Sequence, residues 1–282
     1  MAKELPINQI ICGDCVEVMK SWPDECIDLT VTSPPYDNLR DYKGYTFDFE
    51  TIAKELYRIT KPGGVVVWVV GDATINGSET GTSFRQALYF KDVCGFNLHD
   101  TMIYKRHAPY PPNVRYWQCF EYMFVFSKGE PKTFNPLMQM KKCIDNSDTR
   151  TYRQKDGSLK TLNENAIKRF KRAAQNNYRI ADNIWFYDVG IYKTTKDKYA
   201  YKHPAMFPEQ LAQDHIISWS NPGDLVLDPM CGSGTTCKMA LKLGRRFIGI
   251  DIAEEYCEIA RKRVEAEKER QKFQIIPSSE LS

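Results

Sequence analysis

The chain has 282 residues, of which 42% are hydrophobic and 27% charged, and its formal net charge is +3. This composition excludes a disordered chain and is typical of a globular protein with one large domain or two small ones. The longest apolar run, residues 65–70, is far shorter than the roughly 20 residues of a membrane-spanning helix, and the N-terminus lacks the apolar core of a secretory signal. The sequence therefore predicts a cytoplasmic protein without a membrane partner.

Strand and helix signals alternate toward both ends of the chain. In the first half, short apolar runs predict strands at 8–12, 27–32, 65–70, 98–105 and 121–127. Two more short strands are predicted near the end, at 225–227 and 247–250. Helical spacing of apolar residues predicts helices at 16–22, 49–60, 83–94, 163–174, 208–219, 236–243 and 254–272. The alternation predicts an α/β fold with a mostly parallel central sheet.

Residues 140–202 carry the excess of positive charge. They hold fifteen Lys and Arg against seven Asp and Glu, with aromatic residues interleaved. A basic, aromatic segment suits a polyanion such as nucleic acid, whereas the plainer interpretation is a solvated surface loop. The DNA-binding hypothesis names six side chains, four of them in this segment: Lys168, Arg169, Lys171, Arg172, Arg106 and Arg115.

The nine cysteines are odd in number and are expected to be free thiols in a reducing compartment. Cys12 and Cys15 have C-x-x-C spacing, but a structural zinc site needs a second pair of ligands. The sequence offers no matching pair, so no metal site is predicted.

A glycine-rich motif spans Asp228 to Thr236 and follows a predicted strand. Glycines let the backbone approach a ligand closely, and Asp251, at the end of the next strand, can bind ribose hydroxyls. The motif is not a P-loop, and Cys237 replaces the third small residue of a dinucleotide fingerprint. A tight strand–helix turn without a ligand is the alternative interpretation.

A second motif, Ser33-Pro34-Pro35-Tyr36, also follows a predicted strand. The two prolines fix the backbone and lack N–H donors, so carbonyl oxygens and the Ser33 hydroxyl can form a pocket rich in acceptors. Tyr36 adds a flat face for stacking. Such a pocket suits a planar ring that carries an amino group, although the motif alone is also a plausible turn.

Together the two motifs resemble those of the S-adenosylmethionine-dependent DNA amino-methyltransferases, which methylate N4 of cytosine or N6 of adenine. The resemblance covers about 1–135 and 203–265, and it implies a Rossmann-like methyltransferase fold. The catalytic motif precedes the cofactor loop, as in the circularly permuted beta group of that family. The implied domains are a catalytic half (1–139), a target-recognition insertion (140–202), a cofactor-binding half (203–275) and a tail (276–282).

The resemblance also assigns roles to particular residues. The catalytic residues would be Ser33, Pro34, Pro35 and Tyr36. The residues binding S-adenosylmethionine would be Asp14, Asp228, Pro229, Cys231, Gly232, Ser233, Gly234, Thr235, Asp251, His203 and Pro204. Met230 stands where the family commonly has Phe, so no aromatic ring is expected to pack on the sulfonium there.

The serine at the first catalytic position favours N4 of cytosine, and N6 of adenine is the alternative within the family. A catalytically silent nucleic-acid-binding module is the alternative from another class, and an RNA substrate is also open. The partner is expected to be DNA, with a homodimer and a partner restriction endonuclease as further expectations. The recognition sequence cannot be predicted.

Overall fold

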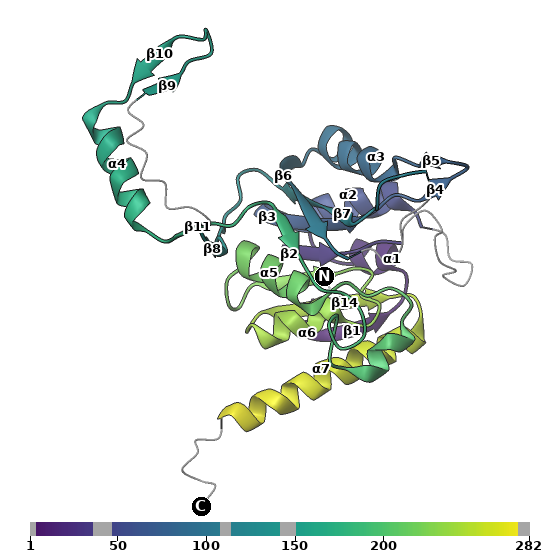
Figure 1. Ribbon diagram of the computed structural model, residues 1–282. Coiled ribbons are helices and arrows are strands. Elements are labelled where there is room, and N and C mark those ends of the chain that lie inside the picture. The colour runs from purple at the N-terminus through teal and green to yellow at the C-terminus, as the bar shows by residue number, and fades with distance from the viewer. Residues whose placement is uncertain (1–3, 36–46, 108–113, 142–150, 276–282) are drawn as a thin grey trace, which may run out of the picture. The chain divides into compact units, whose positions relative to one another are not determined.

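The computed structural model describes residues 4–35, 47–107, 114–141 and 151–275, and it is built around an eight-stranded sheet (Figure 1). The strand order is β1-β14-β13-β2-β3-β7-β6-β12. The strands are β1 (Gln9–Cys12), β2 (Ile27–Thr32), β3 (Thr60–Val70), β6 (Asn97–Lys105), β7 (Phe120–Ser127), β12 (Ile184–Phe186), β13 (Leu225–Asp228) and β14 (Arg246–Asp251). Only β7 runs antiparallel to its neighbours in this sheet. The predicted α/β fold with a mostly parallel sheet is confirmed.

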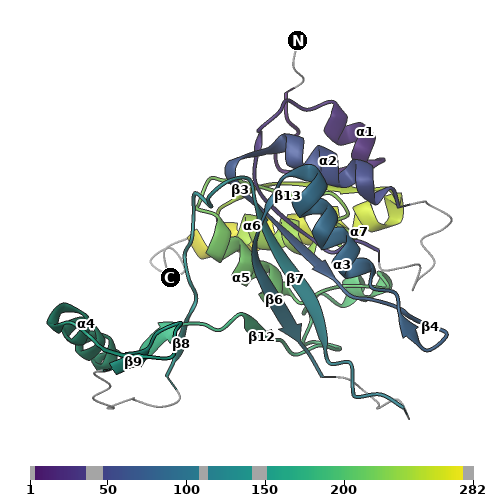
Figure 2. The same cartoon turned by 90° about the horizontal axis from the view of Figure 1, so that it is seen from above.

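Helices cover both faces of the sheet (Figure 2). One face packs against α1 (Cys15–Lys20), α2 (Phe49–Ile59) and α3 (Thr82–Tyr89), which continues into a π-helical turn, Phe90–Cys94. The other face packs against α5 (Glu209–Trp219), α6 (Thr235–Lys242) and α7 (Glu254–Ile275). The apolar run in β3 shows why both layers form: Val67 and Val69 face the second layer, whereas Val66 and Trp68 face the first.

The chain divides into two compact units. The larger unit contains Met1–Asn135 and Asn183–Ser282, and the smaller one Pro136–Asp182. The smaller unit contains a pair of strands, β8 (Met138–Met140) with β11 (Tyr178–Ile180), a hairpin, β9 (Thr151–Arg153) with β10 (Leu159–Thr161), and α4 (Glu164–Gln175). These boundaries differ from the predicted insertion 140–202. Residues 183–202 join the larger unit, because β12 pairs with β6 in the main sheet.

Two asparagines mark the points where the chain leaves and rejoins the larger unit. The Asn135 backbone N–H donates to the Ser218 carbonyl (2.8 Å), and its side-chain amide donates to the Ile217 carbonyl (3.0 Å). At the other end, the Asn183 carbonyl accepts from the Ile103 N–H (2.8 Å). Both junctions are therefore fixed to the larger unit by hydrogen bonds.

The larger unit also carries a small hairpin, β4 (Thr74–Ile75) with β5 (Ser78–Glu79), and a 3₁₀-helix, Lys198–Lys202. Among the described residues, no helix is both long and apolar enough to cross a membrane.

Candidate active site

A cavity of about 1080 Å³ lies where the parallel strands end. Strands β1, β2, β13 and β14 run parallel to one another, so the residues that follow them meet at one edge of the sheet. Thirteen of the side chains or backbone positions named from the sequence line this cavity: Asp14, Ser33, Pro34, Pro35, Arg106, His203, Pro204, Pro229, Cys231, Gly232, Ser233, Thr235 and Asp251. The structure thus brings the two sequence motifs to one cavity.

The glycine-rich loop takes a backbone path that needs its glycines. Gly232 and Gly234 have φ angles of +48° and +77°, in the left-handed region that residues with a Cβ rarely adopt. A Cβ on Gly232 would lie 2.6 Å from Nε2 of His203, and one on Gly234 would lie 2.7 Å from the Cβ of Ala260. His203 therefore packs directly on the loop, and its own ring is in edge contact with Tyr256.

Asp251 both orients the loop and lines the cavity. Its Oδ2 accepts from the Gly232 N–H (2.9 Å), and its Oδ1 accepts from the Ala253 N–H (2.9 Å). Burial raises the pKa of this carboxyl above its ordinary value. A carboxylate oxygen can accept more than one hydrogen bond, so Asp251 can also receive hydroxyl donors from a ligand.

Asp228 lies beneath the cavity rather than in its lining. Its side chain is buried, and Oδ1 accepts from the Thr32 hydroxyl (2.7 Å) and from the Met230 N–H (3.2 Å). Burial raises the pKa of Asp228 to about 6. A second hydrogen bond joins α6 to β2, from the Thr236 hydroxyl to the Val31 carbonyl (3.0 Å). These contacts hold the glycine-rich loop against the end of β2, just before Ser33.

Two other residues of the predicted cofactor set also have structural positions. Asp14 caps α1, accepting from the backbone N–H groups of Val16 (2.7 Å) and Glu17 (3.2 Å), and it lines the cavity. Gly234 is the N-cap of α6 and does not line the cavity.

The turn Ser33–Pro35 shares the cavity with a charged pair. Ser33, Pro34 and Pro35 line the cavity, and Tyr36 lies outside the described residues. Arg106 and Glu121 line the same cavity and form a half-buried ion pair of 3.1 Å. Arg106 was among the residues predicted from the sequence to bind DNA, whereas no role at the site was predicted for Glu121.

The other residues predicted to bind DNA are dispersed. Arg115 donates to the Gly77 carbonyl and pairs with Glu79 (3.7 Å) in the β4–β5 hairpin. Lys168 and Arg169 are exposed on α4 of the smaller unit, whereas the side chains of Lys171 and Arg172 lie outside the described residues.

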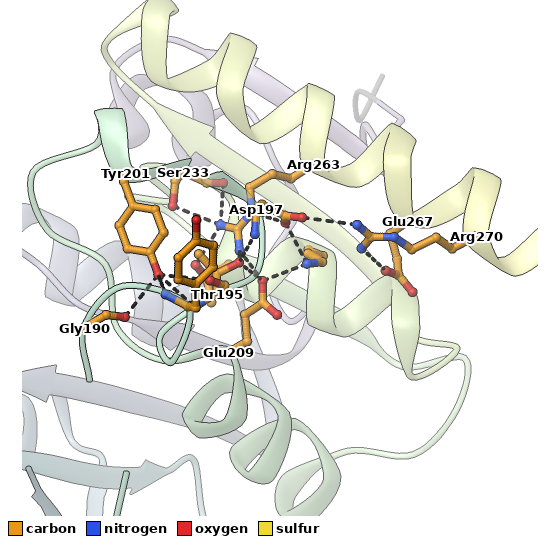
Figure 3. A network of polar contacts seen from close by, with 12 residues as sticks. Gly190, Thr195, Asp197, Tyr201, Glu209, Ser233, Arg263, Glu267 and Arg270 are labelled. Carbon is orange, nitrogen blue, oxygen red and sulfur yellow. Dashed lines mark hydrogen bonds and ion pairs between the residues drawn. The ribbon is translucent and has the colours of Figure 1, made fainter. Parts of the chain in front are cut away.

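A buried ionic cluster was not predicted. It consists of Asp197, Glu209, Lys238 and Arg263, beside the glycine-rich loop (Figure 3). The Lys238 amine lies 2.7 Å from both Asp197 and Glu209. Burial alone would raise the pKa of Asp197, but Lys238 and Arg263 lower it to about 2. The four members are far apart in sequence, so no local pattern could have indicated the cluster.

One group of side chains in the described part of the chain has the composition of a metal site. Cys12, Glu254 and Cys257 place their ligand atoms within 4.8 Å of one another. Both thiols are already hydrogen-bonded to backbone carbonyls, Cys12 to Ile252 and Cys257 to Asp251. Burial also raises the pKa of Cys257 to about 12, which disfavours the thiolate that binds metal.

The sequence matches the model of the N6_N4_Mtase family, described as DNA methylase, over residues 27–262. It is 54% identical over 256 residues to the orphan methyltransferase M.BamHII of Bacillus amyloliquefaciens, which covers 89% of this chain and 90% of that one. The DNA adenine methyltransferase YhdJ of Escherichia coli (strain K12) is 28% identical over 268 residues, covering 91% and 82%.

Solved structures have the same fold. PvuII DNA methyltransferase (cytosine-N4-specific) superposes with a TM-score of 0.66 at 22% identity, covering 90% of this chain and 85% of that one. M1.HpyAVI in its complex with SAM gives 0.59 at 24% identity, covering 91% and 98%. The predicted Rossmann-like methyltransferase fold is confirmed by these likenesses. From the family match and the extent of the similarity to M.BamHII, the chain belongs to the N6_N4_Mtase family of DNA methylases.

Proposed function

We propose that this DNA methyltransferase transfers a methyl group from S-adenosylmethionine to the exocyclic N4 of cytosine in DNA. One observation carries the proposal: the Ser33–Pro35 turn and the loop 229–235 line a single cavity with Asp251. A methyl donor and an amino acceptor must meet within one enclosed site, because positioning supplies much of the rate in such a transfer.

The donor set of the cavity fits this cofactor. Asp251 and Asp14 offer carboxylate oxygens suited to ribose and adenine donors. The loop around Gly232 lies in the same wall, in a backbone conformation that leaves no room for a side chain. When bound, S-adenosylmethionine supplies an electrophilic methyl group on a sulfonium. The relative M1.HpyAVI has been solved in complex with SAM, which supports the same ligand here.

Ser33 and the prolines after it act on the target amine. An exocyclic amino nitrogen is a poor nucleophile, since its lone pair is delocalised into the ring. The Ser33 hydroxyl and the Ser33 and Pro34 carbonyls can accept the amino hydrogens and turn the lone pair out of the ring plane. Preorganised acceptors of this kind stabilise the positive charge that develops on the nitrogen. The base must leave the duplex to reach them, and Tyr36 is predicted to stack on it.

Two features support cytosine as the target. Ser33 at the first catalytic position favours cytosine. Arg106, held by Glu121 in the cavity, can donate to both N3 and O2 of cytosine. Adenine offers N1 but has a C–H group where cytosine has O2, so the same guanidinium fits it less well. The alternative is N6 of adenine, which the name of the relative YhdJ supports.

The order of the motifs supports the beta-group assignment. The Ser33 turn precedes the cofactor loop in the sequence, yet β13 lies in the sheet between β14 and β2. This arrangement is what a circular permutation of the chain would produce. The smaller unit, with Lys168 and Arg169, is proposed to recognise the DNA target, while a homodimer and a partner endonuclease stay predictions.

Transfer of an isotope-labelled methyl group to DNA, followed by nucleoside chromatography, tests the proposal. Label in N4-methylcytosine is the expected result. Label in N6-methyladenine would replace the proposal by its alternative, and no label would favour a silent binding module. Ser33→Ala serves as the control that the activity belongs to this site.

A further inference from the structure

The ionic cluster contains two cations and two anions and is almost fully enclosed, and the half-exposed Arg270 also pairs with Asp197 (3.2 Å). Asp197, Lys238 and Arg263 are 3%, 4% and 0% exposed, and Glu209 is 22% exposed. Two cations are thus paired with two anions in the interior. Burying such pairs costs desolvation, and replacing them with apolar side chains is often neutral or stabilising. Stability alone is therefore a weak explanation for the cluster, and the contacts that it makes beyond itself are more informative.

Arg263 reaches from the cluster to the glycine-rich loop (Figure 3). Its Nη1 lies 2.9 Å from the Ser233 carbonyl oxygen, 3.0 Å from the Ser233 hydroxyl and 3.0 Å from the Thr235 hydroxyl. The remaining nitrogens bind the cluster: Nε donates to Asp197 (3.0 Å) and Nη2 to Glu209 (2.5 Å). One planar fork therefore joins the loop to two fixed carboxylates, a geometry that a lysine cannot reproduce.

The same carboxylates hold a second segment of the cavity wall. The strap, defined as residues 190–203, contains Asp197, and its Thr195 hydroxyl donates to Glu209 (2.6 Å). Within the strap, the Tyr201 hydroxyl donates to the Thr195 carbonyl (2.9 Å). Tyr201 lines the cavity, as do Ser233 and Thr235 of the loop, whereas Arg263 does not. Arg263 thus contacts the wall of the site without facing its contents.

We infer that Arg263 is a positioning residue that sets the loop and the strap around the amino-acid end of S-adenosylmethionine. The inference rests on the proposed function, which places that end of the cofactor at the loop and the ribose at Asp251. Loss of the fork would let Ser233 and Thr235 move, while the adenosine end would keep its contacts with Asp14 and Asp251. The defect should therefore depend on which part of the ligand is tested.

Two ligands distinguish the amino-acid end of the cofactor from its adenosine end. S-adenosylhomocysteine carries the amino-acid group, whereas 5′-deoxy-5′-methylthioadenosine lacks it but keeps the sulfur and the adenosine. For Arg263→Lys we expect the calorimetric Kd of S-adenosylhomocysteine to rise about tenfold or more, the size of one missing charge-assisted hydrogen bond. The Kd of methylthioadenosine should change less than about twofold, and the KM for S-adenosylmethionine should rise more than kcat falls.

Lys238→Met is the matched control, because Lys238 belongs to the cluster and its amine donates to Asp197 and Glu209 rather than to the loop. It should lower the melting temperature at least as much as Arg263→Lys does. The ligand preference, defined as the ratio of the Kd values of S-adenosylhomocysteine and methylthioadenosine, should stay unchanged. Equal losses of S-adenosylhomocysteine affinity in the two variants would overturn the inference, since the cluster would then only stabilise the fold. Equal losses for both ligands in Arg263→Lys would overturn it as well.

A second variant decides the matter should Arg263→Lys fail to fold. Ser233→Ala removes one acceptor of the Arg263 Nη1 group and leaves the cluster intact. It should weaken the binding of S-adenosylhomocysteine but not that of methylthioadenosine. An unchanged preference in Ser233→Ala would contradict the inference. Failure of wild-type protein to bind S-adenosylhomocysteine would instead contradict the proposed cofactor, so the two failures are distinct.

Discussion

The two units of the chain differ in where they keep their apolar side chains. In the larger unit, Val66 and Trp68 are fully buried between two layers of helices. In the smaller unit, Met140, Leu159 and Ile180 are 67%, 68% and 53% exposed. The larger unit thus has a core that can hold a site rigid, whereas the described part of the smaller unit keeps large apolar side chains on its surface.

On the proposed function, chemistry is assigned to the larger unit and recognition of DNA to the smaller one. Every described residue that lines the cavity belongs to the larger unit, and Lys168 and Arg169 belong to the smaller one. Changes in one unit should therefore affect catalysis or stability, and changes in the other should affect the binding of DNA.

Ser33→Ala should have the largest effect. In the proposed mechanism, it removes a hydroxyl acceptor at the reacting amine. We expect kcat to fall roughly 100- to 1000-fold, as for loss of one preorganised group in other enzymes. Single-turnover kinetics would measure this, with the affinities for DNA and cofactor unchanged. A variant with wild-type kcat would contradict the assigned role.

The buried carboxyl of Asp228 should make the stability of the larger unit depend on pH. Its folded pKa of about 6 lies above the ordinary value of 3.8, so its stabilising contribution is full below pH 4 and is lost as pH rises through 6. The free energy of unfolding should fall by about 3 kcal/mol over this interval relative to Asp228→Asn. Asp197, whose pKa is lowered to about 2, contributes stability that is lost as the pH falls below about 4.

Urea unfolding of wild type and Asp228→Asn between pH 3.5 and 7 provides the measurement. The difference between the two proteins cancels the titration of all other groups. Parallel curves would show that Asp228 is not the group responsible.

Asp251→Ala should weaken the binding of the cofactor by about 10- to 100-fold. The substitution removes a hydrogen-bond acceptor for the ligand and leaves the Gly232 N–H without its partner. Calorimetry with S-adenosylhomocysteine would measure the change. Affinity for DNA in the absence of cofactor should hold, and a loss of both would break the separation between the units.

Lys168→Ala with Arg169→Ala should have the smallest effect and should act on DNA alone. Each phosphate that is no longer neutralised makes the log–log dependence of affinity on salt shallower by about 0.9, so the pair should reduce the slope by about 1.8. Fluorescence anisotropy over a salt series would show this. Lys268→Ala with Lys272→Ala, an exposed pair on α7, is the control of equal charge. Equal slopes in both double variants would contradict a DNA-binding role for α4.

The sequence predicted those elements whose signal is local. Residues 27–32 form the strand expected, and the run 65–70 is covered on both faces as its composition indicated. That strand nevertheless begins at Thr60, and its first part is irregular: Gly63 adopts a φ of +76° and the register with β2 shifts between Ile27 and Leu29. The expected break at Lys61–Gly64 is instead an irregular stretch of strand.

The residues of the site also fall into those with a local sequence signal and those without one. Residues at strand ends, such as Ser33 and Asp251, could be placed together because parallel strands share an edge. The pairing of Arg263 with Asp197 could not, since these residues are 66 positions apart and their burial depends on how three helices pack. The short strands of the smaller unit were also missed, because three residues are too few to show an alternation.

The hydrogen bonds from Thr32 to Asp228 and from Thr236 to Val31 join positions 196 and 205 residues apart. The first joins the neighbouring strands β2 and β13, and the second joins β2 to α6, so the proximity of the two motifs does not depend on the peptide that connects them. A chain cut within residues 136–182 and produced as two polypeptides would still present both partners of each bond. The molecule can therefore be regarded as two complementary fragments. If mixing the two fragments restores activity, the chain can serve as a split enzyme that is active only when its fragments associate.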